Sequence, residues 1–242
     1  MDYTGKRQRG RDYSYLAAVT SSTIAVYGMP LYTAEALVLR TYKLGEADRI
    51  VVFLTRDRGK KRGVAPNARK SRKRFGAALE PLTEVRAAYF EKEQRELVML
   101  NYAEPVRSPL SAPSPEALGY SHYFAELIDE WAAEADVDER LYRLGTSALE
   151  ALVTGTPVEA LARYFECWLL RLQGVYPADL QLSSGAAMFL DGVRRIGPRD
   201  VESLGATSGV LREIELIHRK LITMHLDREP RSVRVLNELR RS

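Results

Sequence analysis

The first part of the chain alternates apolar and polar residues with the short period of β-strands. Residues 32–40 and 49–55 are strand-length runs rich in β-branched or aromatic residues, with turn residues between them. A third strand is expected over 60–65, and a fourth and fifth over 82–90 and 97–102. Five short strands in about 70 residues are typical of a small closed barrel.

Beyond the fifth strand the period becomes that of an α-helix. One helical face carries Tyr120, Phe124, Leu127, Ile128, Trp131 and Ala135. The segment 156–159 (TPVE) has the pattern of a capping box with proline at the first helical position, and it predicts a helix that stops at Gly174. Apolar spacing predicts another helix over 210–224, and Ser232 is expected to cap a short last helix.

These patterns predict an α+β protein with an N-terminal five-stranded oligonucleotide-binding (OB) barrel and an all-helical C-terminal domain. The predicted parts are residues 29–104 for the OB fold, a Pro-rich linker over 105–115, and a helical domain over 116–242. Residues 1–28 have no clear period, so they are expected to be a disordered extension before a domain that begins near Met29. No apolar run approaches the roughly 18–20 residues that span a bilayer, and no signal peptide is expected.

Positive charge is concentrated between Arg56 and Arg74. This run holds ten Lys or Arg and one acid, so it carries +9 whereas the whole chain carries +4. A surface that only confers solubility usually mixes both signs. Because Lys and Arg release condensed counterions from phosphates, the run favours nucleic-acid binding. The predicted DNA-binding residues are Lys60, Lys61, Arg62, Arg69, Lys70, Arg72, Lys73 and Arg74.

Aromatic side chains could stack on the bases of single strands. Phe75 directly follows the basic run and completes the predicted site as a stacking residue. Four other aromatics are weaker candidates, because each by itself is more typical of a barrel core or edge than of a stacking site: Tyr42, Tyr89, Phe90 and Tyr102. A second, weaker basic surface is predicted near the end of the chain, at Arg228, Arg231, Arg234, Arg240 and Arg241.

Residues 116–139 carry eight acids and no Lys or Arg. A solvated helix face is the first interpretation, and the alternatives are a docking surface for a basic partner or a wall that keeps nucleic acid on the barrel side. Glu126, Asp129 and Glu130 share a helical turn, but no metal or hydrolytic site is expected there.

No residue pattern in the chain indicates catalysis. His218 and His225 share one helix face without a third ligand, so they are expected to be core or surface histidines. The single cysteine, Cys167, lies among apolar residues and is predicted to be buried and unreactive, which fits a reducing, cytoplasmic compartment. Phosphate-loop, nucleophile-elbow and metalloprotease motifs are absent from the sequence, so we expect no enzyme activity and no cofactor.

Two segments carry a resemblance to a known family. Residues 39–59 (LRTYKLGEADRIVVFLTRDRG) and 59–85 (GKKRGVAPNARKSRKRFGAALEPLTEV) are similar to the N-terminal domain of the RecO family of bacterial recombination mediators. Weaker similarity extends the resemblance over 30–242. It implies an OB fold and a helical domain, binding of single- and double-stranded DNA, and annealing of complementary strands. It also implies work with RecR, which together with this chain would help load RecA onto DNA coated by single-strand-binding protein.

The chain departs from the family in one region. Many members carry a four-cysteine zinc module after a Tyr-Pro turn, whereas residues 180–208 of this chain contain no cysteine. Zinc is therefore expected to be absent, with apolar side chains packing this lobe instead. They are Phe189, Leu190, Val193, Ile196, Val201 and Leu204.

The sequence therefore favours a non-enzymatic, nucleoid-associated protein of recombinational repair, with DNA, RecR and single-strand-binding protein as direct partners, RecA as an indirect one, and no membrane contact. Two other hypotheses stay open. One is an adaptor whose helical domain holds RecR and the tail of single-strand-binding protein, with incidental DNA contact. The other is an OB-fold protein that acts on structured RNA.

Overall fold

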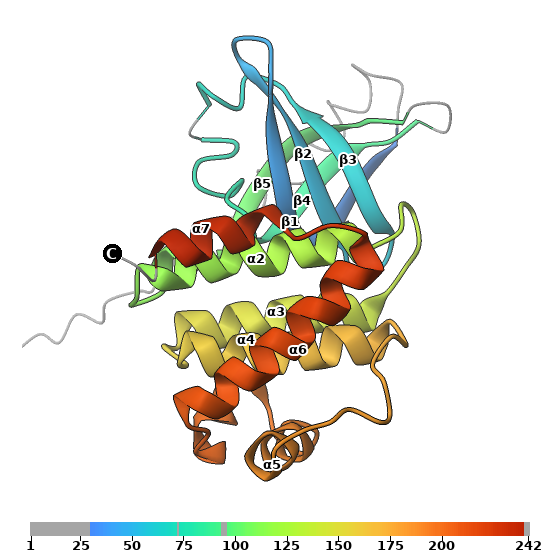
Figure 1. The fold of residues 1–242 in the computed structure, drawn as a ribbon. Helices are drawn as coiled ribbons and strands as arrows, with labels where there is room; N and C mark the ends of the chain where they lie inside the picture. Colours follow the sequence, from blue (N-terminus) through green and yellow to red (C-terminus); the bar gives the residue numbers. More distant parts are fainter. Residues whose placement is uncertain (1–29, 72, 93–95, 240–242) are drawn as a thin grey trace, which may run out of the picture.

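The computed structural model describes residues 30–71, 73–92 and 96–239 (Figure 1). In these ranges a five-stranded barrel stands on stacked helices, with α2 and α7 directly beneath the strands (Figure 1). The predicted extension, residues 1–28, lies outside the described ranges. None of the helices within these ranges is long and apolar enough to cross a membrane.

The predicted five-stranded barrel is confirmed. The strands are β1 (Leu31–Leu44), β2 (Asp48–Thr55), β3 (Gly59–Ala65), β4 (Glu84–Phe90) and β5 (Val98–Arg107), and they close in the order β1-β2-β3-β5-β4. β4 starts two residues later than predicted because Leu82 takes a left-handed backbone angle (φ 63°) that no strand accommodates. β5 runs further than predicted, into the segment expected to be a linker.

Two features of the backbone close the barrel. β1 pairs with β4 through residues 31–37 and with β2 through residues 36–44, and a bulge between Val38 and Arg40 bends it from one partner to the other. β3 and β5 meet in parallel only at Gly63–Val98 and Val64–Met99. A Cβ on Gly63 would lie 2.8 Å from Cγ2 of Val98, so only glycine fits this junction without displacement.

The run Ala36–Leu39 is buried on both sides of β1. Ala36 and Val38 point into the barrel, whereas Leu37 and Leu39 belong to the core formed with the helices. Neighbouring strands and the loop before β4 add Val52, Leu54 and Leu82 to that second core. Each such side chain contributes about 1.5–3 kcal/mol by leaving water, so the barrel and the helices are joined by a shared apolar core.

The helices are α2 (Glu116–Trp131), α3 (Glu139–Val153), α4 (Val158–Leu172), α5 (Ser184–Val193), α6 (Ser208–Leu226) and α7 (Arg231–Leu239), with short 3₁₀ turns η1 (Pro109–Ser111) and η2 (Pro198–Leu204). α3 and α5 were not predicted. Ala135 is not part of the predicted helical face, because α2 ends at Trp131 and Ala135 has a φ of 58°.

Two predicted helix caps are wrong. Pro157 takes the N-cap position of α4 without any side-chain cap, and Thr156 is buried instead. Ser232 lies inside the first turn of α7, where Glu126 of α2 supplies the cap. Its carboxylate accepts bonds from the backbone N–H of Arg231 (2.9 Å) and Ser232 (2.8 Å). The pKa of Glu126 is lowered overall. Burial by itself would raise it, but the hydrogen bonds from Ser232 and Arg231 stabilise the charged carboxylate more strongly.

A buried polar cluster joins α2, α4 and α6. Glu166 is 2% exposed and accepts bonds from the Tyr123 hydroxyl (2.8 Å) and the Arg163 guanidinium (2.7 Å). Nδ1 of His218 lies 3.0 Å from the same carboxylate, and its Nε2 lies 3.1 Å from the hydroxyl of Tyr176. His218 is therefore a satisfied core histidine, one of the two predicted environments, and burial lowers its pKa.

Replacement of Glu166 by Ala should lower the free energy of unfolding by about 3–5 kcal/mol, because Arg163 would keep a buried charge without its main partner. Urea unfolding followed by circular dichroism measures this loss. The control is Glu202→Ala on the exposed side of η2, which should change stability by less than about 0.5 kcal/mol. Equal effects of the two substitutions would contradict a structural role of the cluster.

The stability of the protein should also fall as the pH drops below the ordinary histidine pKa of about 6.5. The folded pKa of His218 lies below its unfolded value, so the unfolded chain binds more protons in acid, and the free energy of unfolding rises with pH. Urea titrations at pH 7.5 and 5.5 test this, and His218→Gln should show a smaller difference. His122→Gln, on the exposed side of α2, should leave the difference unchanged.

Candidate nucleic-acid interface

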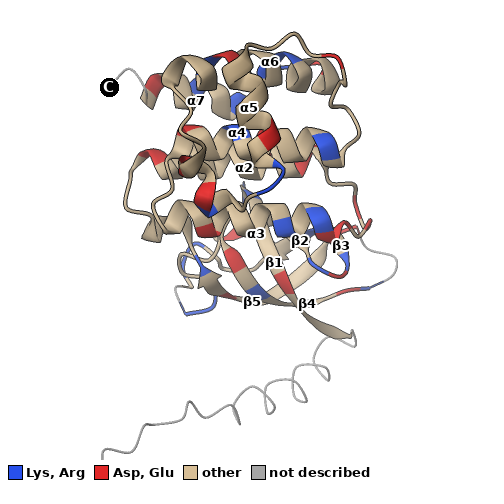
Figure 2. Ribbon diagram, turned by 90° about the horizontal axis from the view of Figure 1, so that it is seen from below, with Lys and Arg blue, Asp and Glu red and all other residues tan. Residues whose placement is uncertain are grey.

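The predicted basic site divides into two parts in the structure. The first part lies on β3, at Lys60, Lys61 and Arg62. The second lies in the loop that joins β3 to β4, and Figure 2 shows its blue segments at the lower left, on the side of the barrel. Arg72 lies outside the described residues.

The three cations of β3 face carboxylates of the same chain. Nζ of Lys60 donates to the backbone carbonyl of Asp129 at 2.8 Å and lies 3.4 Å from its carboxylate. Lys61 pairs with Glu91 at 2.5 Å and is only 15% exposed. Arg62 lies 4.0 Å from Glu134 and remains 45% exposed. Lys60 and Lys61 are thus used inside the protein, whereas Arg62 is only loosely paired.

The acidic stretch 116–139 is the counterpart of this strand. Asp129 is 11% exposed and receives Arg40 of β1 at 2.8 Å as well as Lys60. Glu130 also contacts Arg40, at 3.2 Å. The pKa of Arg40 is raised overall. Burial by itself would lower this pKa, but the charge of Asp129 and the hydrogen bonds to Tyr42 and Glu130 have the larger effect. The prediction of a solvated face is therefore wrong for this part of α2, which meets basic residues of the barrel instead.

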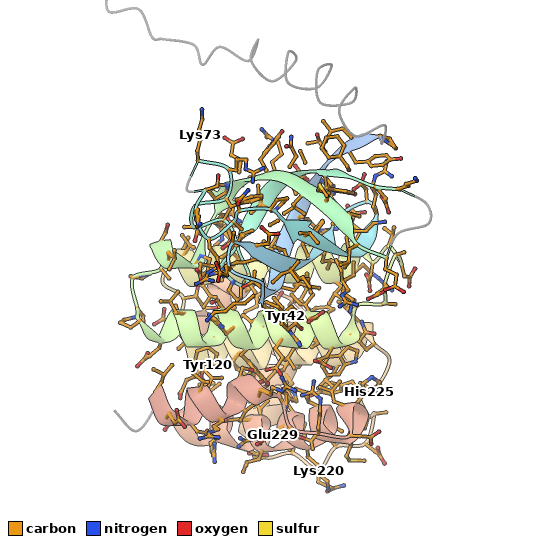
Figure 3. All side chains as sticks on the ribbon, turned by 90° about the horizontal axis from the view of Figure 1, so that it is seen from above. Tyr42, Lys73, Tyr120, Lys220, His225 and Glu229 are labelled. Carbon is orange, nitrogen blue, oxygen red and sulfur yellow. The ribbon has the colours of Figure 1, made fainter. Side chains whose placement is uncertain are left out.

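The loop cations are the remaining described members of the predicted site: Arg69, Lys70, Lys73 and Arg74. No described carboxylate lies within ion-pair distance of any of them. Arg69 donates to the backbone carbonyl of Glu46 at 2.7 Å, and Arg74 donates to that of Pro66. Lys70 and Lys73 are exposed, and Lys73 extends away from the barrel in Figure 3. The loop therefore presents positive charge that the described acids do not neutralise.

Internal contacts hold the described backbone of this loop near Asn67, Arg69 and Phe75. The N–H of Arg69 donates to the carbonyl of Ala47 at 3.0 Å, which ties the loop to the turn between β1 and β2. The N–H of Asn67 donates to the Asp48 carboxylate at 2.7 Å. Phe75 anchors the other end inside the barrel core and is 2% exposed. Cations on a fixed loop lose less conformational freedom on binding than cations on a flexible one.

The burial of Phe75 corrects its predicted role. A ring that packs among Val38, Val51 and Leu100 in the barrel presents no face to a nucleobase. Its neighbour Arg74 covers it, with the guanidinium carbon 5.0 Å from the ring centroid. Among the weaker candidates, Tyr89 and Phe90 are also buried, whereas Tyr42 is 43% exposed and Tyr102 is half-buried.

Two cations outside the predicted site, Lys43 and Arg49, lie beside the loop. Arg49 opposes Lys43 across β1 and β2, and it opposes Ala65, the residue directly before the loop, across β2 and β3. Neither cation forms an ion pair with a carboxylate in the described part of the chain. The pattern of β2 could have indicated Arg49, because this cation directly precedes the continuous apolar run 50–54. We call Lys43, Arg49 and the loop cations the basic surface.

The second predicted basic surface is partly neutralised. Arg228 pairs with Glu130 at 2.5 Å, and Arg234 pairs with Glu238 at 3.2 Å. The side chain of Arg231 is exposed, and no described carboxylate lies within ion-pair distance of it. Arg240 and Arg241 lie outside the described residues.

The region that carries zinc cysteines in many family members is packed by apolar residues, as predicted. Phe189, Leu190, Val193 and Val201 are buried, and Ile196 and Leu204 pack against them. These residues offer no thiolate for a four-cysteine site. Cys167 is buried as predicted, and burial raises the pKa of its thiol, which makes it a weak nucleophile.

Comparisons with known proteins agree with this architecture. Residues 29–109 match the family described as Recombination protein O N terminal, and residues 112–181 match Recombination protein O C terminal. The chain is 44% identical to DNA repair protein RecO of Koribacter versatilis over 149 residues, which cover 61% of this chain and 60% of that protein.

Two proteins of the same name from bifidobacteria are also similar. The chain is 42% identical to that of Bifidobacterium adolescentis over 128 residues, which cover 51% of each chain. It is 36% identical to that of Bifidobacterium longum over 194 residues, which cover 70% of this chain and 79% of the relative. The match thus spans less than two thirds of the Koribacter versatilis and Bifidobacterium adolescentis proteins.

Lys60→Met should change the stability of the protein, whereas Lys70→Met should change its binding to DNA. Loss of Lys60, which is 13% exposed, removes a partner of Asp129 and should cost about 1–3 kcal/mol of stability, with little effect on affinity for a single-stranded oligonucleotide. Lys70→Met should leave stability unchanged and lower the salt dependence of binding by about 0.7 in log–log slope. Thermal unfolding and fluorescence anisotropy of both variants test the division. Equal loss of affinity in both would contradict it.

Proposed function

Because this chain belongs to the RecO family of DNA repair proteins, we propose that it binds DNA through the basic surface and anneals complementary strands without catalysing a covalent step. With RecR, it would help load RecA onto DNA coated by single-strand-binding protein. The partners follow from membership in the family, whereas the binding surface follows from the residues of this chain.

The observation that supports the proposal is the difference between β3 and the loop. Lys60 and Lys61 are neutralised by carboxylates of the same chain, but the loop cations have no described carboxylate within ion-pair distance; Arg69 and Arg74 donate to backbone carbonyls, and Arg74 also donates to the Ser71 hydroxyl. A polyanion gains most from cations whose charge is not already compensated. The loop cations therefore carry the proposed affinity, together with Lys43 and Arg49.

Annealing needs no catalytic residue. Two complementary strands repel each other through their phosphates until cations screen the charge, and a fixed set of Lys and Arg can do this for both strands. Base pairing then supplies the sequence specificity. Since the basic surface includes several side chains on one loop and one hairpin, it can hold a strand by its phosphates.

Annealing of two labelled complementary oligonucleotides, bare or coated with single-strand-binding protein, tests the proposal across a salt series. The protein should accelerate annealing of both substrates without metal or nucleotide, and the acceleration should fall as salt rises. If four to six phosphates are contacted, the affinity for single strands should follow salt with a log–log slope of about −3 to −4.

The matched variants for this experiment reverse four cations each. Arg69, Lys70, Arg72 and Lys73 replaced by Glu should abolish binding and annealing while the fold is kept. Arg140, Arg143, Arg194 and Lys220 replaced by Glu, on the exposed sides of the helical part, should leave both nearly unchanged. Both variants carry a net charge of −4 instead of +4, so a general charge effect would impair them equally and refute the site.

Two outcomes of the same experiment support the other hypotheses. Tight binding of structured RNA in preference to single-stranded DNA favours the RNA-binding alternative. The adaptor hypothesis is favoured if the unmodified protein has no effect on annealing, while the variant with the four loop cations reversed still captures RecR or a peptide from the tail of single-strand-binding protein.

A further inference from the structure

An apolar groove of about 630 Å³ lies where β1, α2 and α7 meet. Its walls include Leu39 and Tyr42 of β1, Leu118 and His122 of α2, and Val235 and Leu239 of α7. The volume falls in the range of sites that hold small organic groups. Figure 3 shows Tyr42 between the barrel and α2, in line with this position.

Two contacts of α2 with α7 form the far wall of the groove. Glu126 holds the first turn of α7 by accepting its backbone N–H groups. At the other end, a Cβ on Gly119 would lie 2.6 Å from Cδ1 of Leu239, so glycine allows α7 to approach α2 closely there. Both contacts involve described residues of regular helices, which gives the groove a preformed wall rather than one that must be assembled on binding.

Tyr42 is the aromatic side chain of this groove. Leu37 and Leu39 of β1 are buried in the core with the helices, but Tyr42, further along the strand, is 43% exposed. Its hydroxyl accepts a bond of 3.1 Å from Arg40, which is itself fixed by Asp129. The guanidinium carbon of Arg40 also lies over the ring, 6.0 Å from its centroid, so Arg40 orients the ring while 43% of the residue stays exposed.

The groove and the basic surface share one hairpin. Tyr42 is followed on β1 by Lys43, and the turn after this strand accepts the side chain and the N–H of Arg69. The lining also includes His122 and Arg231, both exposed, and the carboxylate of Glu126, which is bonded to the start of α7. Successive strand residues face opposite sides, so Lys43 points away from the groove, and the exposed cation that an anionic chain meets at its rim is Arg231.

We propose that the groove receives unpaired nucleobases of single-stranded DNA, stacked on Tyr42, while the phosphates of the same strand lie on the basic surface. This inference rests on the proposed function and names its base-binding site, which takes the role predicted for Phe75. Every base has an aromatic face, so such stacking needs no particular sequence. Paired bases of an intact duplex are enclosed in their own stack, so the groove favours single strands over duplex.

The test compares a 20-residue oligothymidylate with an abasic oligonucleotide of the same length, which keeps the phosphates and lacks the bases. Fluorescence anisotropy at fixed salt should show that the unmodified protein binds the oligothymidylate about tenfold more tightly. Tyr42→Ala should abolish this ratio by weakening only the binding of oligothymidylate. Tyr42→Trp should keep the ratio, and its added fluorescence should be quenched by oligothymidylate but not by the abasic strand.

A second pair of variants tests the groove without changing Tyr42. Val235→Glu places a carboxylate in the groove, and Leu216→Glu places one on the outer face of α6, where the native side chain is equally exposed (50% and 52%). Only the first should lower the ratio. Thermal unfolding of all four variants shows that each is folded.

The possible failures are distinguishable. If the unmodified protein binds both oligonucleotides equally and the four-residue charge reversal abolishes both, the proposed function stands and the base-binding site is wrong. If the charge reversal changes neither affinity, the proposed function itself fails. A base preference that survives both Tyr42→Ala and Val235→Glu would also overturn the assignment of the groove.

Discussion

Burial of the outer face of β1 and β2 against the helices is the constraint on which the rest of the structure depends. Leu37, Leu39, Val52 and Leu54 lie in one core with α2 and α3. An isolated OB barrel could leave this face to solvent or to a ligand, since strands 2 and 3 are a common binding face of the fold. Here apolar packing occupies part of it, and any nucleic acid must bind beside the covered area.

The same contact decides which cations are available to a ligand. Once β1 and β2 pack on α2, the acids at its C-terminal end lie opposite Arg40 and Lys60, and these pairs form across the edge of the apolar core. Ion pairs that are mostly removed from water are held by strong electrostatic attraction, so they do not open easily for a phosphate. The loop cations lie beyond this edge, where no described acid reaches them.

The helices contribute fixed positions for one another through buried hydrogen bonds. Glu166 links α2, α4 and α6 through buried bonds, and Glu126 fixes the start of α7. The Glu126 contact fixes the wall that α7 forms for the groove lined by Tyr42. The docking of α2 and α7 therefore forms the groove, whereas the basic surface is built on the β1–β2 hairpin and the loop tied to it.

The sequence by itself determined the barrel, most of the helices, the apolar packing of residues 180–208 and the concentration of positive charge, because strand alternation, helical periodicity and composition are local properties. It could not show that Phe75 is buried, that Glu126 caps α7, or that α2 neutralises β3, since each depends on residues distant in the chain. Those pairings were decided only by the tertiary structure, because the free energy of a side chain depends on the neighbours that folding brings to it.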